Sequence, residues 1–240
     1  MQTMIALGKR EFLSYFRTPV AYVYLVVFLV ATVVLAFFVG QFFESNEASL
    51  RSMFQFFPWL LIFLGPAMGM RLWSEEKRSG TWELIATLPI RTSEAVLGKF
   101  LAAWAFVSLA ILLTFPMALT IAYLGSPDWG PVFTGYLGAL LVAGSVLAIC
   151  SLASALTRNQ VVSFVISFLI CLLWSFLGVG LVANLLGTLF PSWLANALSY
   201  ISLLTHYEAL MLGVLQVRSL LFFLVLTAFA LMINIQILKR

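Results

Sequence analysis

The sequence has 240 residues, of which 63% are hydrophobic and only 9% are charged, and its mean hydropathy is +1.09. Soluble domains carry roughly 25% charged residues, so this composition excludes a water-soluble fold. The net charge of +4 comes from basic residues scattered through short connections, which argues against a nucleic-acid partner and favours contact with lipid headgroups.

Residues 1–19 predict an amphipathic helix that lies along the cytoplasmic membrane surface. Its polar side carries Lys9, Arg10 and Arg17, and its apolar side carries Ile5, Phe12, Leu13 and Phe16. The simpler interpretation is a headgroup anchor, and the sharper one is an elbow helix that also touches a cytoplasmic partner. Both stay open. No cleavable signal peptide is expected, because an acidic residue and a bulky stretch precede the first apolar run.

Six runs without charged residues follow, each long enough to cross a bilayer once. They cover residues 20–40, 54–70, 100–124, 132–156, 161–190 and 219–238. The sequence therefore predicts an all-α integral membrane protein whose six-helix transmembrane domain covers residues 20–240. The fifth run exceeds one span, but a seventh crossing would carry Asn184, Pro191 and Asn196 through the bilayer. We expect an external, partly re-entrant segment at about 181–218 instead.

The basic residues predict the orientation of these spans. If the N-terminus is cytoplasmic, 11 of the 13 Lys and Arg residues are cytoplasmic, and only Arg51 and Arg218 are external. By the positive-inside rule, both termini are expected in the cytoplasm. In the external segment, Trp193, Tyr200 and Tyr207 suit the membrane interface, where one end of an aromatic ring stays wet.

The longest cytoplasmic connection, residues 71–99, carries the most information. Gly80 interrupts the chain there, and a short helix is expected over residues 81–88, where Pro89 ends it. Trp82, Leu84 and Leu88 give that helix an apolar side, which must be buried against lipid or another protein. A solvated loop is the plainer interpretation, and a docking helix is the more economical one.

The spans contain no ionisable residue, which secondary carriers normally need at membrane depth, so the energy source is expected elsewhere. The sequence has no GxxxxGK phosphate loop, no GxSxG or HExxH pattern and no metal-ligand cluster, so no catalytic, cofactor or metal residue is predicted. His206 beside Glu208 is expected to bond a neighbour rather than act as an acid–base pair. The GPAMG stretch at 65–69 favours close helix packing, with a dimer seam as the lesser alternative.

Four stretches resemble a known family. LWSEEKRSGTWELIATLPI, followed by LGKF, resembles the first coupling region of the ABC type-2 exporter permeases. YFRTPVAYV, PDWGPVFTGYLG and THYEALMLGVLQVRSLLFF resemble the branch that includes permeases of gliding motility and nitrous-oxide-reductase maturation. Relatives often carry an acidic residue just before the last span, where this chain has Arg218 instead.

The resemblance implies a non-catalytic permease subunit in a bacterial cytoplasmic (inner) membrane. Two copies of a cognate ABC ATPase would bind ATP and Mg²⁺ and drive export or extraction of a substrate that the sequence does not identify. A second copy or a paralogue would complete the pathway, and the segment at 181–218 would meet any extracytoplasmic auxiliary protein. The implied ATPase-docking residues are Glu75, Glu76, Arg78, Gly80, Thr81, Trp82, Glu83, Leu84, Leu88, Arg158 and Asn159.

Two alternatives to the transporter remain at this point. One is an ATP-driven membrane scaffold that moves an attached extracytoplasmic protein, as gliding-associated relatives would. The other is a passive channel or secondary carrier, which would need no ATPase. Gene context separates the scaffold from the transporter, because a neighbouring gene for a large extracytoplasmic protein would favour the scaffold. Co-purification separates the channel or carrier, which would purify alone.

Overall fold

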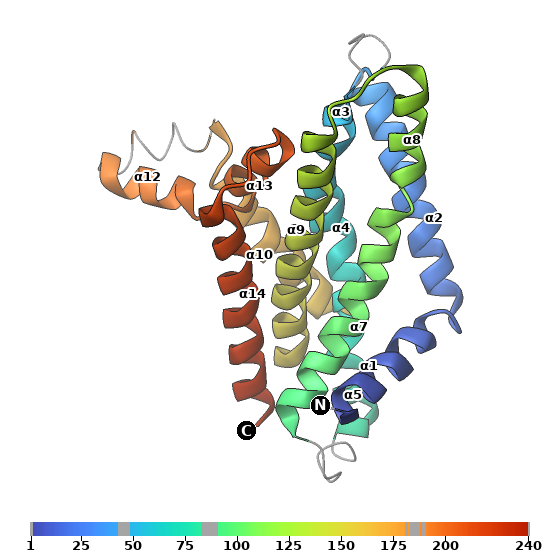
Figure 1. Cartoon of the computed structure of the whole chain (residues 1–240). Helices are drawn as coiled ribbons and strands as arrows, with labels where there is room; N and C mark the ends of the chain where they lie inside the picture. Colours follow the sequence, from blue (N-terminus) through green and yellow to red (C-terminus); the bar gives the residue numbers. More distant parts are fainter. Residues whose placement is uncertain are drawn as a thin grey trace.

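The computed structural model describes residues 2–42, 49–82, 91–180, 182, 188 and 191–239. Within these ranges the elements are helices, and most of them stand side by side in one upright bundle (Figure 1). The first helix begins and the last helix ends at the same end of the bundle, marked N and C (Figure 1). We call this the terminal end and the other the distal end.

The N-terminal half runs along the bundle three times, after a first helix at the terminal end. Its elements are α1 (Gln2–Tyr15), α2 (Pro19–Val34) with its π-helical extension η1 (Leu35–Val39), α3 (Arg51–Phe54), α4 (Phe57–Gly69), α5 (Arg71–Ser79), α7 (Thr92–Leu112) and α8 (Phe115–Leu124). Prolines stand in the first turn of α2, α4 and α8, where the absent N–H costs no helical hydrogen bond. The amphipathic N-terminal helix is therefore present, as α1.

The C-terminal half is built around one long helix. Its elements are α9 (Trp129–Leu156), α10 (Gln160–Phe176), α12 (Ser192–Tyr200), α13 (Leu203–Met211) and α14 (Val217–Leu238). Helix α9 begins at Asp128, whose carboxylate accepts a hydrogen bond from the Gly130 N–H at 2.9 Å. It packs against α4, α5, α7, α10, α13 and α14. The core of the bundle therefore surrounds α9.

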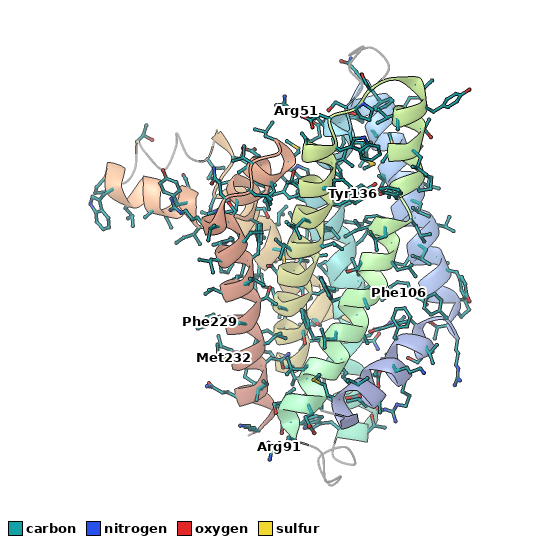
Figure 2. The ribbon with its side chains drawn as sticks, in the orientation of Figure 1. Arg51, Arg91, Phe106, Tyr136, Phe229 and Met232 are labelled. Atoms are coloured by element: carbon teal, nitrogen blue, oxygen red, sulfur yellow. The ribbon has the colours of Figure 1, made fainter. Side chains whose placement is uncertain are left out.

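Five described segments are long and apolar enough to cross a membrane. They are Pro19–Val39, Arg51–Ser79, Thr92–Leu124, Trp129–Leu156 and Val217–Leu238. A multi-pass membrane protein is therefore confirmed. The fifth predicted span, residues 161–190, corresponds to α10, which has 17 residues and rises about 25 Å, close to the lower limit for spanning. Phe229 and Met232 on α14 point away from the bundle, as lipid-facing residues do (Figure 2).

The small-residue stretch in α4 serves packing inside the chain. A methyl group added at Gly65 would come within 2.6 Å of the Val146 side chain, and one at Gly69 would overlap Cys150, both on α9. The two backbones can approach closely only because these positions lack a side chain. The packing interpretation of this motif is confirmed.

At the distal end, α12 extends sideways from the bundle while α13 folds back onto it (Figure 1). Trp193 and Tyr200 on α12 are 70% and 52% exposed, as interfacial aromatic residues are. The same prediction for Tyr207 is wrong. Tyr207 is 2% exposed because α13 packs on α9, and its hydroxyl donates to the Phe54 carbonyl at 2.9 Å.

The single histidine is held by its neighbours, as predicted. The His206 Nε2 lies 2.8 Å from the Tyr200 carbonyl oxygen, and Nδ1 lies 3.2 Å from the Ser219 hydroxyl. The imidazole also stacks on Phe222, with ring centroids 4.2 Å apart. Burial lowers the pKa of His206 below its ordinary value. These contacts give the residue a structural role between α13 and α14.

Candidate functional site

The connection after α5 begins with a sharp left-handed turn. Helix α5 carries Lys77 and Arg78 in its last turn, where positive charge complements the helix dipole, and ends at Gly80, whose φ is +74°. A φ of that sign favours glycine, so the predicted break at Gly80 is confirmed. Thr81 and Trp82 are helical beyond it. Glu83, Leu84 and Leu88, which complete the predicted docking helix, lie outside the described residues.

Trp82 is anchored on the bundle through a second tryptophan. Its ring meets the buried Trp73 ring edge to face, with centroids 5.3 Å apart and an interplanar angle of 89°. The Trp73 Nε1–H in turn donates to the Ser151 hydroxyl of α9 at 3.0 Å, and Asn234 of α14 donates to the same hydroxyl at 2.6 Å. The tryptophan pair thus ties the start of the predicted docking helix to two spans.

Ser154 of α9 joins α4 to α5 at their junction. Its hydroxyl oxygen accepts from the backbone N–H groups of Trp73 and Ser74, both at 3.0 Å. The same hydroxyl donates to the Met70 carbonyl at 2.8 Å. Helix junctions leave backbone groups without partners, and here a buried serine satisfies them. The position of α5 is therefore fixed by α9 as well as by α4.

The second predicted docking connection, 157–160, lies beside the first. Thr157 follows the last turn of α9, and the Asn159 side chain caps α10 by accepting from the Val161 N–H at 2.9 Å. Lys77 of α5 donates to the Ala155 carbonyl at the C-terminus of α9. This contact bridges the two connections and places a positive charge at the negative end of the α9 dipole.

A groove opens between the two connections and the end of α14. Its cavity volume is about 230 Å³. The lining residues are Lys77, Gly80, Trp82, Leu156, Thr157, Arg158, Ile237 and Leu238. We call it the terminal groove. It combines an apolar floor with Lys77 and Arg158, so it can receive an apolar side chain beside an acidic one.

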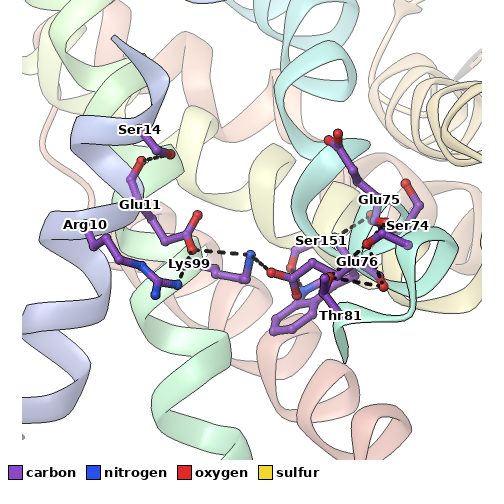
Figure 3. A network of polar contacts seen from close by, with 12 residues as sticks. Arg10, Glu11, Ser14, Ser74, Glu75, Glu76, Thr81, Lys99 and Ser151 are labelled. Atoms are coloured by element: carbon purple, nitrogen blue, oxygen red, sulfur yellow. Dashed lines mark hydrogen bonds and ion pairs between the residues drawn. The ribbon is translucent and has the colours of Figure 1, made fainter. Parts of the chain in front are cut away.

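The remaining predicted docking residues divide into exposed and buried ones. Glu75, Arg78 and Thr81 are exposed at the terminal end. The Glu76 side chain is turned inward and is only 16% exposed. Its Oε1 forms an ion pair with the Lys99 Nζ at 2.6 Å (Figure 3). In this structure Glu76 joins two helices inside the chain.

Lys99 forms the centre of a buried charged cluster that sequence reasoning missed. Its side chain is 7% exposed, and its Nζ lies 2.6 Å from Glu76 of α5 and 3.7 Å from Glu11 of α1 (Figure 3). It also lies over the Trp73 ring, 5.4 Å from the centroid. We call Glu11, Glu76 and Lys99 the charged triad. It connects α1, α5 and α7.

Helix α1, the predicted elbow helix, packs against α7. A methyl group added at Gly8 would lie 3.3 Å from the Gly98 carbonyl oxygen, so the two backbones cross in close contact. Farther along, Phe16 packs on Phe106 with ring centroids 5.6 Å apart, and Phe12 packs on Phe16. The polar-side residues Lys9, Arg10 and Arg17 are exposed. Phe12 and Phe16 are therefore partly covered by protein, whereas Ile5 and Leu13 on the same predicted apolar side are 58% and 48% exposed.

One signal in the sequence pointed to Glu11. It shares a helical face with Leu7 and Tyr15, which are four residues away on either side and which pack on the core. Burial raises the pKa of Tyr15, in agreement with that placement. An acidic residue on an apolar face requires a buried cation, but the choice of Lys99 depends on how α1 crosses α7.

Comparison with known proteins gives one family. Residues 41–235 match the family described as "ABC-2 family transporter protein". No curated protein sequence matches the chain.

Proposed function

Because the chain belongs to the ABC-2 family of transporter proteins, we propose that it is a permease subunit whose terminal groove receives a separate ABC ATPase. The family works with an ATPase partner, and its membrane component is generally non-catalytic. The observation that carries the proposal is the convergence of two connections, 81 sequence positions apart at Lys77 and Arg158, on one groove beside the end of α14.

The charges and the apolar floor of the groove define the partner surface. Lys77 and Arg158 favour an acidic side chain, and Trp82 with Leu156 favours an apolar one. Glu75 and Arg78, exposed on α5, would add polar contacts at the rim. A rotation of the ATPase against this groove would move α5 directly, because the groove includes the end of α5 and the residues that follow it.

The proposal includes the membrane arrangement. Helix α10 also crosses the membrane and brings the number of spans to six, the terminal end is cytoplasmic, and the membrane is the bacterial cytoplasmic membrane. Two permeases, identical or paralogous, work with two ATPase copies that bind ATP and Mg²⁺, and the direction of transport is export or extraction. Membership in the gliding and nitrous-oxide-reductase-maturation branch is supported by the sequence stretches alone. The proposal that an auxiliary protein binds at the distal end is likewise supported by the sequence alone.

Docking is tested by charge and aromatic substitutions at the groove. The tagged chain is co-expressed with its ATPase, purified in mild detergent, and assayed for bound ATPase and ATP hydrolysis. Trp82→Asp and Arg158→Glu should each weaken binding by about 2 kcal/mol or more, roughly thirtyfold, as loss of an interface anchor does. The matched controls, Trp193→Asp and Arg51→Glu at the distal end, should retain the ATPase.

Two substitutions are needed because Trp82 also contacts Trp73. Arg158 has no hydrogen bond or ion pair among the described residues, so its replacement leaves the fold intact. If Arg158→Glu and Trp82→Asp both co-purified normal amounts of ATPase, the groove would not be the docking site.

Orientation is tested by cysteine labelling in intact cells. Both native cysteines, Cys150 and Cys171, are buried and give little background. An impermeant maleimide should label Tyr123→Cys, whose parent side chain is 90% exposed near the distal end, and should spare Ser79→Cys until the cells are opened. The reverse pattern would place the termini outside and refute cytoplasmic docking.

A further inference from the structure

A second cavity lies at the terminal end, between the elbow helix and the α4–α5 junction. Its volume is about 230 Å³. Its polar lining comes from Glu11, Ser14 and Thr18 of the elbow region, Arg71, Glu75 and Glu76 of α5, and Lys99 of α7. Its apolar lining comes from Val20, Ala21, Ala67, Met68 and Leu72. We call it the elbow cavity. It is separate from the terminal groove, since no residue lines both.

Most of the charge around the elbow cavity is already neutralised within the protein. Glu11 and Glu76 share Lys99 in the charged triad. The two hydroxyl groups donate to nearby carbonyls, Ser14 to Glu11 and Thr18 to Tyr15. Each of these residues therefore has a partner within the protein, although the second carboxylate oxygen of Glu76, Oε2, is buried without a hydrogen bond.

Arg71 and Glu75 are the exception. The Arg71 Nε is buried and has no hydrogen-bond partner, and neither side chain forms an ion pair within the described residues. They lie one helical turn apart on α5 and line the same cavity. Glu75 points away from Lys99 (Figure 3), so the triad does not absorb its charge. A buried guanidinium N–H without a partner is costly, which indicates a ligand there.

The apolar lining indicates that this ligand is a lipid. Val20 and Ala21 begin α2, the first apolar span, and Val23 and Val27 continue along it as exposed residues. The polar part of the cavity therefore lies where charged residues give way to the hydrocarbon-facing surface, the level of phospholipid headgroups. A soluble anion would gain nothing from Val20, Ala67 and Met68 in the cavity lining.

We propose that the elbow cavity binds the headgroup of a zwitterionic phospholipid, with its phosphate on Arg71 and its ammonium on Glu75. Arginine donates in a fork that matches phosphate oxygens, and a carboxylate one turn away matches a neighbouring ammonium group. A singly anionic headgroup would satisfy Arg71 but leave Glu75 facing a like charge. The site is independent of ATPase docking and holds whether the lipid is transported or only bound.

The experiment measures lipid bound to the intact chain by native mass spectrometry after delipidation in mild detergent. Phosphatidylethanolamine and phosphatidylglycerol are added in equal amounts. The unmodified chain should retain phosphatidylethanolamine preferentially. Arg71→Gln should lower its retention at least about tenfold, because a charge-assisted hydrogen bond is lost. Arg91→Gln, which removes an exposed positive charge at the same end, should retain it fully.

Two further variants separate the parts of the proposal. Glu75→Gln should abolish the preference for phosphatidylethanolamine while leaving phosphatidylglycerol bound. Ala67→Phe, which fills the apolar part of the cavity without changing its charge, should lower retention of both lipids, and its unfolding temperature shows whether it is folded.

Several results would overturn the proposal. Equal losses in Arg71→Gln and Arg91→Gln would show that the attraction is not specific. Displacement of the lipid by millimolar inorganic phosphate would identify a soluble-anion site instead. Unchanged retention in a folded Ala67→Phe variant would place the lipid elsewhere. Because the readout is lipid binding, none of these outcomes depends on the ATPase.

Discussion

Replacing Lys99 by methionine should destabilise the protein strongly. The substitution keeps the volume of the aliphatic stem but removes the cation that Glu76 and Glu11 share at 2.6 and 3.7 Å. Both carboxylates are at most 20% exposed, so they would be left buried beside each other without a counter-charge. Breaking one partner out of a buried ion pair costs about 3–5 kcal/mol. For a domain of this size, that corresponds to a lowering of Tm by roughly 6–20 °C.

The assay is thermal unfolding of the purified chain in detergent, followed by tryptophan fluorescence. Lys9→Met, at an exposed position of the elbow helix, is the matched control and should shift Tm by less than about 2 °C. Lys99→Met combined with Glu76→Gln should be more stable than Lys99→Met alone, because one orphaned charge is removed. If the double variant were no more stable, or if Lys99→Met matched Lys9→Met, the triad would not act as a buried charged unit.

Three further predictions use the same unfolding assay. Gly69→Ala should lower the free energy of unfolding by about 1–3 kcal/mol, because the new methyl group overlaps Cys150. The control Gly180→Ala, whose methyl group meets no neighbour, should be nearly neutral, and equal effects would contradict the close packing of α4 on α9. Trp73→Phe should cost about 1–2 kcal/mol through the lost indole hydrogen bond to α9, and an unchanged Tm would contradict it. Since the pKa of His206 is lowered in the folded state, the unfolded state binds more protons just below pH 6.5, so stability should fall as pH drops through that range. His206→Gln should flatten this dependence, and an identical slope would refute it.

Hydropathy predicted the five long apolar segments because each needs only local information, about 20 apolar residues between charged connections. The break at Gly80 and the presence of an N-terminal helix were predictable for the same reason. A left-handed turn depends on one residue, and a helical face depends on a period of 3.6. The close contact of the GPAMG stretch was also predictable, although the sequence left open whether its partner helix belonged to this chain or to another copy.

The charged triad could not be predicted, because it depends on tertiary contacts. Glu11, Glu76 and Lys99 are far apart in the sequence. Each follows a charged residue or an apolar stretch, and the local sequence alone does not show which buried partner it meets. Their pairing depends on the close crossing of α1 and α7 at Gly8 and Gly98. Tyr207 failed for a related reason. An aromatic residue with one polar atom suits an interface and a core equally, and only the folding of α13 onto α9 decides between them.

Helix α5 connects α7, α9 and the terminal groove at the terminal end of the bundle. One of its faces carries Glu76, which shares Lys99 with the elbow helix, and another carries Trp73, which meets α9 and, through Ser151, Asn234 of α14. Its last turn borders the terminal groove at Lys77. If α5 moved while α7 stayed in place, Glu76 would separate from Lys99. If α5 moved while α9 stayed in place, the hydrogen bond from Trp73 to Ser151 would break. Movement imposed at the groove must therefore either be transmitted to both helices or cost the buried interactions that hold them.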